Sequence, residues 1–332
     1  MNREIIECAS EAEWLALRER DVTSTETAAL FGCSPYLTEY ELWHRKTGQL
    51  PVEFEVNQRM VWGNRLESAI AMGIAEDFGL IVEPFKVYVR IPELRMGSSF
   101  DFKIIGLREG APDNIYRELF REHGPGIMEV KNVDGLAFKR GWIADGEDME
   151  APPHIELQVQ HQQEVADLDW TLIAPLVGGN TPRPFHRLRN RDYGGLICDK
   201  IATFWHSVDI GKAPDPDYSK DGDTIARLFA NDNGETLDMT GNNRLAELVA
   251  AYTAAAADEK AAKARKDAAK AEALLLIGNA AKVVGSGFTI SAAKTKGSQG
   301  KLITEADVGS YVGGRAGYRD FRVNLKSGAP TK

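Results

Sequence analysis

The stretches Ser-Ser-Phe-Asp-Phe-Lys-Ile-Ile-Gly (98–106) and Gly-Ile-Met-Glu-Val-Lys-Asn (126–132) decide the fold. Apolar and polar residues alternate in both, which predicts two short strands that carry acids. Residues two apart on a strand point to the same face, so Glu129 and Lys131 project together, and Asp101 belongs to a neighbouring strand. An acid and a lysine on a buried strand are costly to desolvate without a partner or a metal.

These residues predict a site for a hard divalent cation. The carboxylates of Asp101 and Glu129 and the carbonyl of Val130 would form an oxygen-lined pocket for Mg²⁺, with Mn²⁺ as the alternative cation. The cation would neutralise a phosphodiester and lower the pKa of Lys131, which would act on water. The pattern resembles the core motif of the PD-(D/E)XK nucleases. The alternative is two ordinary strands with a surface salt bridge.

Composition describes a globular chain without a membrane span. The chain has 332 residues, 43% of them apolar, which is enough for one large domain or two smaller ones. It contains no run of about 18 apolar residues, and its acidic first residues hold no apolar signal core. Cys8, Cys33 and Cys198 are too widely spaced for a disulfide framework or a zinc site, which fits a reducing cytoplasm.

Charge is distributed unevenly along the chain. The net charge is −9, but residues 251–332 contain 14 Lys and Arg against 7 Asp and Glu, which leaves −16 for residues 1–250. The overall balance argues against a nucleic-acid partner. The basic C-terminal part is the better candidate for a surface that faces phosphate.

The N-terminal region predicts three helix starts. Ser10 and Glu13 form a capping box for a helix over 10–20, and a second helix over 38–48 ends at Gly48. Between them, hydroxyls at 23–25 followed by Glu26 predict another helix start, whose free backbone N–H groups would bind an anion.

Residues 18–48 resemble the opening motif of the YqaJ-like viral recombinases, the family of phage lambda exonuclease. The resemblance is carried by Arg18, Thr23-Ser24-Thr25-Glu26, Ala29-Leu30-Phe31-Gly32, Ser34-Pro35-Tyr36, Glu41-Leu42-Trp43 and Lys46-Thr47-Gly48. In that family this segment binds the DNA terminus. The resemblance therefore implies a 5′-phosphate site formed by Arg18 and the hydroxyls of 23–25. Among these hydroxyls we favour Ser24, although the residues before it replace the family's usual glycines.

Two further segments extend the resemblance. Trp62-Gly63-x-x-x-Glu67, on a helix over 60–79, is similar to the family's Gly-x-x-x-Glu, whose acid lies beside the metals; the alternative is a solvated helix residue. On a helix over 154–166, Gln158 and Gln162 share one face. The family's Gln-Val-Gln-His segment implies that Gln158 helps to hold the water or the metal shell. The family's upstream tyrosine is absent, and His154 or Ile155 occupies its place.

The remaining elements are predicted from periodicity. Residues 81–91 read as one strand that pairs with 97–105, and 107–125 as a charged insertion. Strands are expected over 170–179 and 185–191, the second with His186, Arg187, Arg189 and Arg191 available to phosphate, and a helix over 193–210. A long Ala/Lys/Glu-rich helix follows over 241–277, and then strands over 288–294, 301–303 and 318–325.

We therefore predict an α/β PD-(D/E)XK core, a central mixed sheet flanked by helices, with a C-terminal helical arm and a small β tail. The catalytic domain would span 1–216, the linker and arm 217–285, and the basic tail 286–332. Asp101, Glu129, Val130 and Glu67 would hold the metal, and Lys131 and Gln158 would act on water.

The resemblance implies a phage or prophage exonuclease that degrades duplex DNA ends 5′ to 3′. It also implies a single-strand annealing protein as partner and a ring-shaped homo-trimer, without membrane association. The alternatives are an endonuclease of the same superfamily and a DNA-binding recombination accessory protein without catalysis.

Overall fold

A computed structural model describes residues 2–51, 58–145 and 148–293. Its backbone contacts divide the chain into two units, Met1–Leu228 and Phe229–Lys332, and each unit is described by itself.

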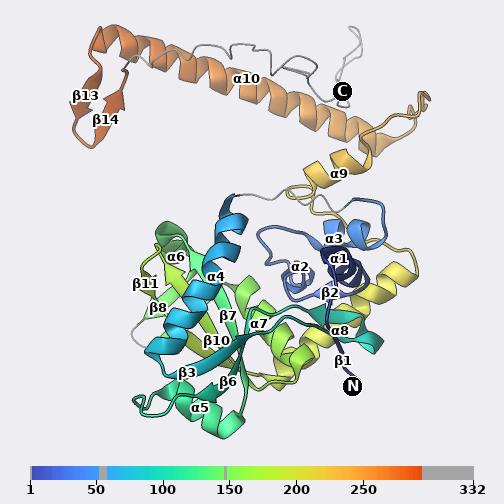
Figure 1. The fold of residues 1–332 in the computed structure, drawn as a ribbon. Coiled ribbons are helices and arrows are strands. Elements are labelled where there is room, and N and C mark those ends of the chain that lie inside the picture. The colour runs from blue at the N-terminus through green and yellow to red at the C-terminus, as the bar shows by residue number, and fades with distance from the viewer. Residues whose placement is uncertain (1, 52–57, 146–147, 294–332) are drawn as a thin grey trace, which may run out of the picture. The chain divides into compact units, whose positions relative to one another are not determined.

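The first unit alternates helices and strands along the chain (Figure 1). Its helices are α1 (Glu11–Arg20), α2 (Thr27–Leu30), α3 (Glu39–Lys46), α4 (Gln58–Asp77), the 3-10 helix η1 (Pro92–Leu94), α5 (Ile115–His123), α6 (Gly135–Gly141), α7 (Pro153–Ala166), α8 (Arg191–Asp209) and α9 (Gly222–Leu228). Its strands are β1 (Glu4–Ile6), β2 (Val22–Thr23), β3 (Leu80–Pro84), β4 (Tyr88–Ile91), β5 (Met96–Ser98), β6 (Phe102–Leu107), β7 (Gly126–Val133), β8 (Ile143–Asp145), β9 (Asp148–Glu150), β10 (Trp170–Val177), β11 (Thr181–Pro182) and β12 (Phe185–Leu188).

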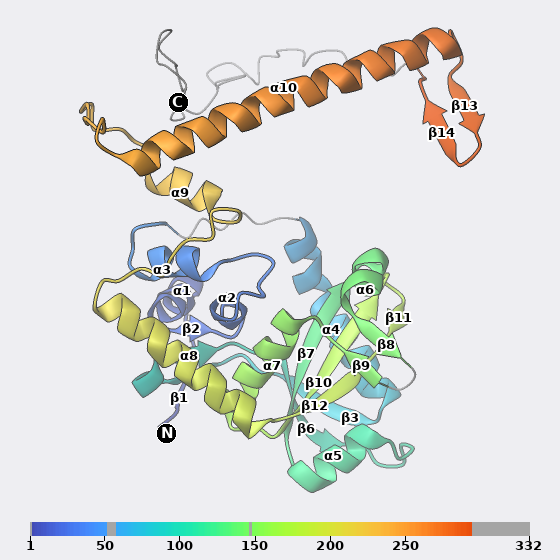
Figure 2. The same cartoon turned by 180° about the vertical axis from the view of Figure 1, so that it is seen from behind.

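A mixed sheet lies at the centre of this unit. Its strand order is β11-β10-β7-β6-β3, with β12 also paired to β10. Strand β7 runs parallel to β10 and antiparallel to β6. Helix α4 covers one face and α7 the other, as Figures 1 and 2 show from opposite sides. The predicted class, a central mixed sheet flanked by helices, is confirmed.

Strand β7 is buried on both faces, so its two sets of side chains enter different cores. Met128 and Val130 pack with Ile70 and Ile74 of α4. Ile127 belongs to the core on the other face, which also holds Val165 of α7. Because side chains alternate along a strand, Glu129 and Lys131 share the α7 side with Ile127.

A smaller sheet, β1-β4-β5-β2, lies beside the central one. The single strand predicted over 81–91 is wrong, because β3 pairs with β6 in the central sheet and β4 pairs with β5 in the smaller one. The ladder between β3 and β6 ends at Pro84, which has no N–H to donate. The strand predicted over 98–106 is likewise divided, and Asp101 lies in the link between β5 and β6.

Several local predictions agree with the structure. Ser10 Oγ accepts a hydrogen bond from the Glu13 N–H at 3.2 Å, and a Glu13 carboxylate oxygen accepts from the Ala9 N–H at 2.8 Å. Gly48 follows α3 with a φ of 73°, the left-handed conformation that favours glycine. The segment predicted as an insertion over 107–125 contains helix α5, whose Leu119 packs into the sheet core.

Residues 217–228 belong with the first unit, although the predicted catalytic domain ended at residue 216. Thr38 Oγ1 donates to a buried carboxylate oxygen of Asp221 at 2.5 Å, and Arg227 pairs with Glu41 at 2.6 Å. These contacts tie α9 to α3.

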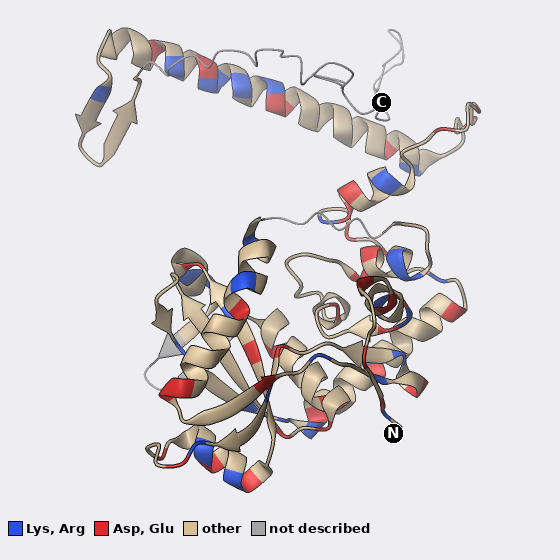
Figure 3. Ribbon diagram, in the orientation of Figure 1, with Lys and Arg blue, Asp and Glu red and all other residues tan. Residues whose placement is uncertain are grey.

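The second unit contains helix α10 (Asn243–Ile277), β13 (Lys282–Gly285) and β14 (Phe288–Ser291), which pair as a hairpin. The long helix predicted over 241–277 is confirmed. Most of its charged residues lie between Asp258 and Glu272, and residues 248–257 carry none (Figure 3). The strands predicted over 301–303 and 318–325 lie outside the described residues. In the part of the chain that is described, no helix combines the length and apolar character needed to span a membrane.

Candidate active site

Asp101 reaches β7 because β6 stops pairing with it at this point. The β6–β7 ladder ends at the pair Phe102 and Met128. Beyond this pair, the Val130 N–H donates to a carboxylate oxygen of Asp101 at 2.7 Å. The N–H and C=O of one strand residue point to the same edge, so the Val130 carbonyl also lies on the edge that faces Asp101.

Glu129 is buried and accepts hydrogen bonds from side chains of two elements. Lys131 Nζ lies 2.6 Å from its Oε1, and Gln158 Nε2 of helix α7 donates to the same oxygen at 2.6 Å. Lys131 Nζ also donates to Gln158 Oε1 at 3.2 Å. The structure therefore brings together Asp101, Glu129, Lys131 and Gln158, all predicted as site residues.

Gln162 is a site residue that sequence reasoning did not assign. Its Nε2 donates to Glu129 Oε2 at 2.8 Å, so each oxygen of that carboxylate accepts from an amide of α7. Its Oε1 is buried and has no hydrogen-bond partner among the described residues. The signal was present, because Gln162 lies four residues after Gln158 on one helix face.

The acids of this site raise one another's pKa. Burial raises the pKa of Asp101 well above its usual range, and the neighbouring charge of Glu129 raises it further. The pKa of Glu67, on α4, is raised by burial and then by Glu129. Burial alone would lower the pKa of Lys131, but the charges of Glu129 and Asp101 outweigh it and leave that pKa raised. Like charges are thus held close together with one lysine as counter-charge.

The donors at Asp101 and Glu129 fit a hard divalent cation. The ligands would be carboxylate oxygens and one backbone carbonyl oxygen, which are the types that Mg²⁺ prefers. A bound cation would also relieve the repulsion that raises the pKa of Asp101. The buried Gln162 Oε1 offers an acceptor for a cation-bound water. Over residues 2–51, 58–145 and 148–293, no group of three or more His, Cys, Asp or Glu could hold a metal ion. The pKa of Glu67 responds to the charge of Glu129, and its role as a ligand stays a prediction.

The predicted 5′-phosphate residues differ in their exposure. Thr23 and Ser24 are buried, and Ser24 Oγ accepts from Ser98 Oγ at 2.9 Å. Thr25 is exposed, and Arg18 Nη2 lies 3.4 Å from its hydroxyl. The accessible hydroxyl is thus that of Thr25, whereas Ser24 was favoured from the sequence.

The helix predicted to start at 23–25 begins slightly later, at Thr27 with Glu26 as its N-cap residue, and α2 is only four residues long. Glu26 precedes it, and a carboxylate oxygen of Glu26 accepts from the Thr23 N–H at 2.9 Å. That carboxylate is held by Lys46, 2.9 Å away. Burial would raise the pKa of Glu26, but the charges of Lys46 and Arg18 outweigh it and lower that pKa. Part of the predicted anion site is thus filled by the protein's own anion.

The arginines in β12 and in the residues after it form ion pairs within the protein. Arg187 pairs with Glu156 at 2.8 Å, and Arg189 pairs with Glu164 at 2.7 Å and is 3% exposed. Because these guanidinium groups are engaged, the prediction that both are available to phosphate is wrong. Arg191 is 64% exposed and pairs with Asp169 at its surface.

A cavity of about 540 Å³ opens beside the site. Its lining includes Lys131, Gln158, Thr25, Tyr36 and His154. It therefore connects the carboxylate site with the accessible hydroxyl of the predicted 5′-phosphate segment.

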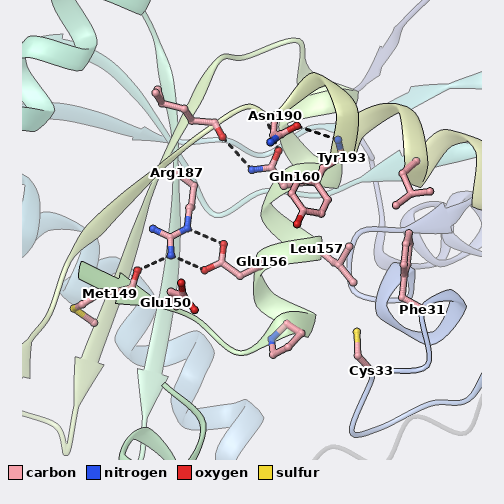
Figure 4. A pocket seen from close by; sticks show the side chains of 13 residues that line it. Phe31, Cys33, Met149, Glu150, Glu156, Leu157, Gln160, Arg187, Asn190 and Tyr193 are labelled. Carbon is pink, nitrogen blue, oxygen red and sulfur yellow. Dashed lines mark hydrogen bonds and ion pairs between the residues drawn. The ribbon is translucent and has the colours of Figure 1, made fainter. Parts of the chain in front are cut away.

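A larger cavity of about 940 Å³ lies against other residues of α7. Figure 4 shows that its polar side chains contact one another: Arg187 pairs with Glu156, and Gln160 accepts from the Asn190 N–H at 2.8 Å. None of the carboxylates of the candidate site lines it. We therefore place the chemistry in the smaller cavity.

Fold and site together define an α/β protein in which carboxylates, a lysine and glutamines form a cluster at the middle strand of a mixed sheet. Residues 13–169 match the model of the YqaJ-like viral recombinase domain. The predicted resemblance is thereby confirmed. A relative is the uncharacterized protein YqaJ of Bacillus subtilis (strain 168), 27% identical over 240 residues, which cover 71% of this chain and 69% of the relative.

The solved structures that are similar to this chain include two exonucleases. An alkaline exonuclease (LHK-Exo) from Laribacter hongkongensis has a TM-score of 0.44 and 17% identity, over 60% of this chain and 93% of that one. A phage-related exonuclease from Haemophilus somnus 129PT has a TM-score of 0.36 and 14% identity, over 62% of this chain and 89% of that one.

Proposed function

We propose that this chain is a metal-dependent deoxyribonuclease that degrades linear duplex DNA from its 5′ ends. The observation that supports the proposal most is the environment of Glu129, a buried carboxylate beside Asp101 that contacts Lys131 and two amides. In a domain that resembles the viral recombinases, that cluster is the described group of side chains best suited to phosphodiester hydrolysis.

Asp101, Glu129 and the Val130 carbonyl would hold Mg²⁺, with Mn²⁺ as the alternative cation. When bound, the cation supplies positive charge against the phosphate and lowers the pKa of water. Gln158 and Gln162 hold the Glu129 carboxylate from both sides, which fixes its orientation. Glu67, whose pKa is raised by the charge of Glu129, would join these ligands from α4.

Lys131 is an ammonium donor in this arrangement, because its pKa is raised by Glu129 and Asp101. It therefore orients the attacking water and stabilises charge on a phosphate oxygen. Attack of the water oxygen on phosphorus breaks the bond to the 3′ oxygen. The products are a 3′-hydroxyl on the released nucleotide and a 5′-phosphate on the shortened strand.

The DNA end would be held by Arg18 and Thr25. A guanidinium and an exposed hydroxyl 3.4 Å apart are matched to a terminal phosphate. Thr23 and Ser24 support this segment from inside the protein, since both are buried. The 3′ single strand that remains would pass to a single-strand annealing protein, and a ring-shaped trimer would enclose the duplex.

The test compares end-labelled linear duplex with covalently closed circular DNA of the same sequence, with Mg²⁺ and with a chelator. Linear duplex should be degraded only with the metal, and 5′-phosphorylated ends faster than 5′-hydroxyl ends. Nicking of closed circles without a preference between ends would assign the endonuclease alternative. DNA binding without cleavage under every condition would assign the accessory protein.

A further inference from the structure

The cavity beside Lys131 contains an aromatic residue that the hydrolytic chemistry does not use. Tyr36 is 80% exposed. Its backbone is held by a turn, because Ser34 Oγ accepts from the N–H groups of Tyr36 and Leu37, each at 3.2 Å. Leu37 packs against the core, so the turn is anchored on one side while the tyrosine ring faces outward.

His154 forms a second aromatic surface of the same cavity. Its ring lies 6.0 Å from that of Tyr36, edge to face at 90°. It is four residues before Gln158 on α7, so it shares the helix face whose amide contacts Lys131. Burial and the charge of Lys131 lower the pKa of His154, which favours a neutral ring.

The cavity also borders both groups proposed to hold the two phosphates on either side of a single nucleoside. Thr25, next to Arg18, and Lys131 both line it. If the terminal phosphate binds at Thr25 and the phosphate under attack lies at Lys131, the nucleoside between these two phosphates must occupy the space between those residues. Tyr36 and His154 line the same cavity.

We propose that this cavity is the binding site for the base of the 5′-terminal nucleotide, which stacks on Tyr36 beside the edge of His154. The proposal rests on the proposed function, and it names the subsite that positions the nucleotide to be released. Stacking on an aromatic ring tolerates every base, because each has a π face, so the subsite would hold an end without selecting its sequence.

The first test combines Tyr36→Ala with a 5′-phosphorylated duplex whose terminal nucleotide lacks its base. With an intact terminal base, Tyr36→Ala should lower kcat/KM on the order of 10-fold, the range expected for one base–aromatic stack. With the abasic end the variant and the wild type should be equal. Tyr36→Phe keeps the ring and should act as wild type on both ends. An equal loss on both substrates, or no loss on either, would overturn the proposal.

Tyr193→Ala is the matched control, because Tyr193 is 55% exposed and lines the other cavity along α7. It should leave both rates unchanged.

A second measurement separates this subsite from the hydrolytic function. In the Lys131→Ala background, a duplex with 2-aminopurine as its 5′-terminal base should lose fluorescence on binding, and adding Tyr36→Ala should restore it. Absent quenching, or quenching that survives Tyr36→Ala, argues against the subsite. A wild-type protein that leaves linear duplex intact while quenching is Tyr36-dependent would reject the proposed nuclease and retain the subsite.

Discussion

Helix α7 carries glutamines on two of its faces, and the glutamines of the two faces contact different kinds of atoms. On the face toward β7, Gln158 and Gln162 donate to the Glu129 carboxylate at 2.6 and 2.8 Å. On the face toward β12, Gln160 and Gln163 donate to the backbone carbonyls of Leu188 and Arg187 at 3.0 and 2.8 Å. All four side chains are buried.

The difference separates two uses of one residue type. An amide that donates to a backbone carbonyl replaces a missing ladder bond and contributes to stability, because a buried carbonyl without a donor costs about 1–3 kcal/mol. An amide that donates to a charged carboxylate sets the orientation of that charge. Loss of the first kind should lower the free energy of unfolding, and loss of the second kind should lower the rate of hydrolysis.

The largest effect is expected from Lys131→Ala, on the β7 face. Loss of a group that orients water should reduce hydrolysis by more than about 10²-fold. The free energy of unfolding should fall far less than the rate, because Gln158 and Gln162 still donate to the buried Glu129 carboxylate when its counter-charge is lost. Single-turnover rates on end-labelled duplex and a thermal unfolding curve measure the two quantities. Near-wild-type turnover would remove Lys131 from the mechanism.

Asp101→Asn and Glu129→Gln should lower activity and Mg²⁺ affinity together, with a rate loss on the order of 10²-fold. Hard cations need charged oxygen donors, and each substitution removes one. Titration calorimetry with Mg²⁺ and with Ca²⁺ measures the affinity; Ca²⁺ should bind without supporting cleavage. Unchanged metal binding in both variants would place the cation elsewhere.

His161, on a third side of helix α7, should make the free energy of unfolding depend on pH. It is buried, with Nδ1 2.6 Å from Thr27 Oγ1 and Nε2 3.0 Å from the Gly97 carbonyl oxygen. Burial lowers its pKa to about 4 from 6.5. Between these values the unfolded chain binds more protons than the folded one, so stability is full above pH 6.5 and falls as the pH drops toward 4. The loss should total about 3 kcal/mol.

Urea unfolding at several pH values between 7 and 4 measures that loss. His161→Gln should flatten this part of the pH dependence while keeping a polar side chain at the position. An identical slope in the variant would assign the acid sensitivity to other groups.

The smallest effects, and the sharpest contrast, are expected from two neighbouring residues. Gln162→Leu should slow hydrolysis by about 10-fold, because Glu129 Oε2 loses a donor. Gln163→Leu should leave the rate unchanged and cost about 1–3 kcal/mol of stability, because the Arg187 carbonyl is left without its donor. Hydrolysis rates and urea unfolding midpoints of both variants measure the two effects. A rate loss in Gln163→Leu as large as in Gln162→Leu would remove the distinction between the faces.

Patterns local in sequence predicted much of this site. Alternation placed Glu129 and Lys131 on one face of a strand, and helical spacing placed Gln158 and Gln162 on one face of a helix. The division of 81–91 between two sheets was missed, because alternation is the same on both sides of Pro84. The ion pairs of Arg187 and Arg189 were missed as well, because their partners lie on α7 and in the turn after it.

The sequence by itself determined the fold class, the resemblance of residues 13–169 to the YqaJ-like viral recombinase domain and the acid–lysine pair on β7, because each depends on spacing along one segment. Only the tertiary structure decided which groups meet that pair and which hydroxyl is accessible. Exposure of Thr25 and burial of Ser24 depend on the contact with Ser98, far away along the chain. Contacts between distant segments are created by packing, which periodicity does not record.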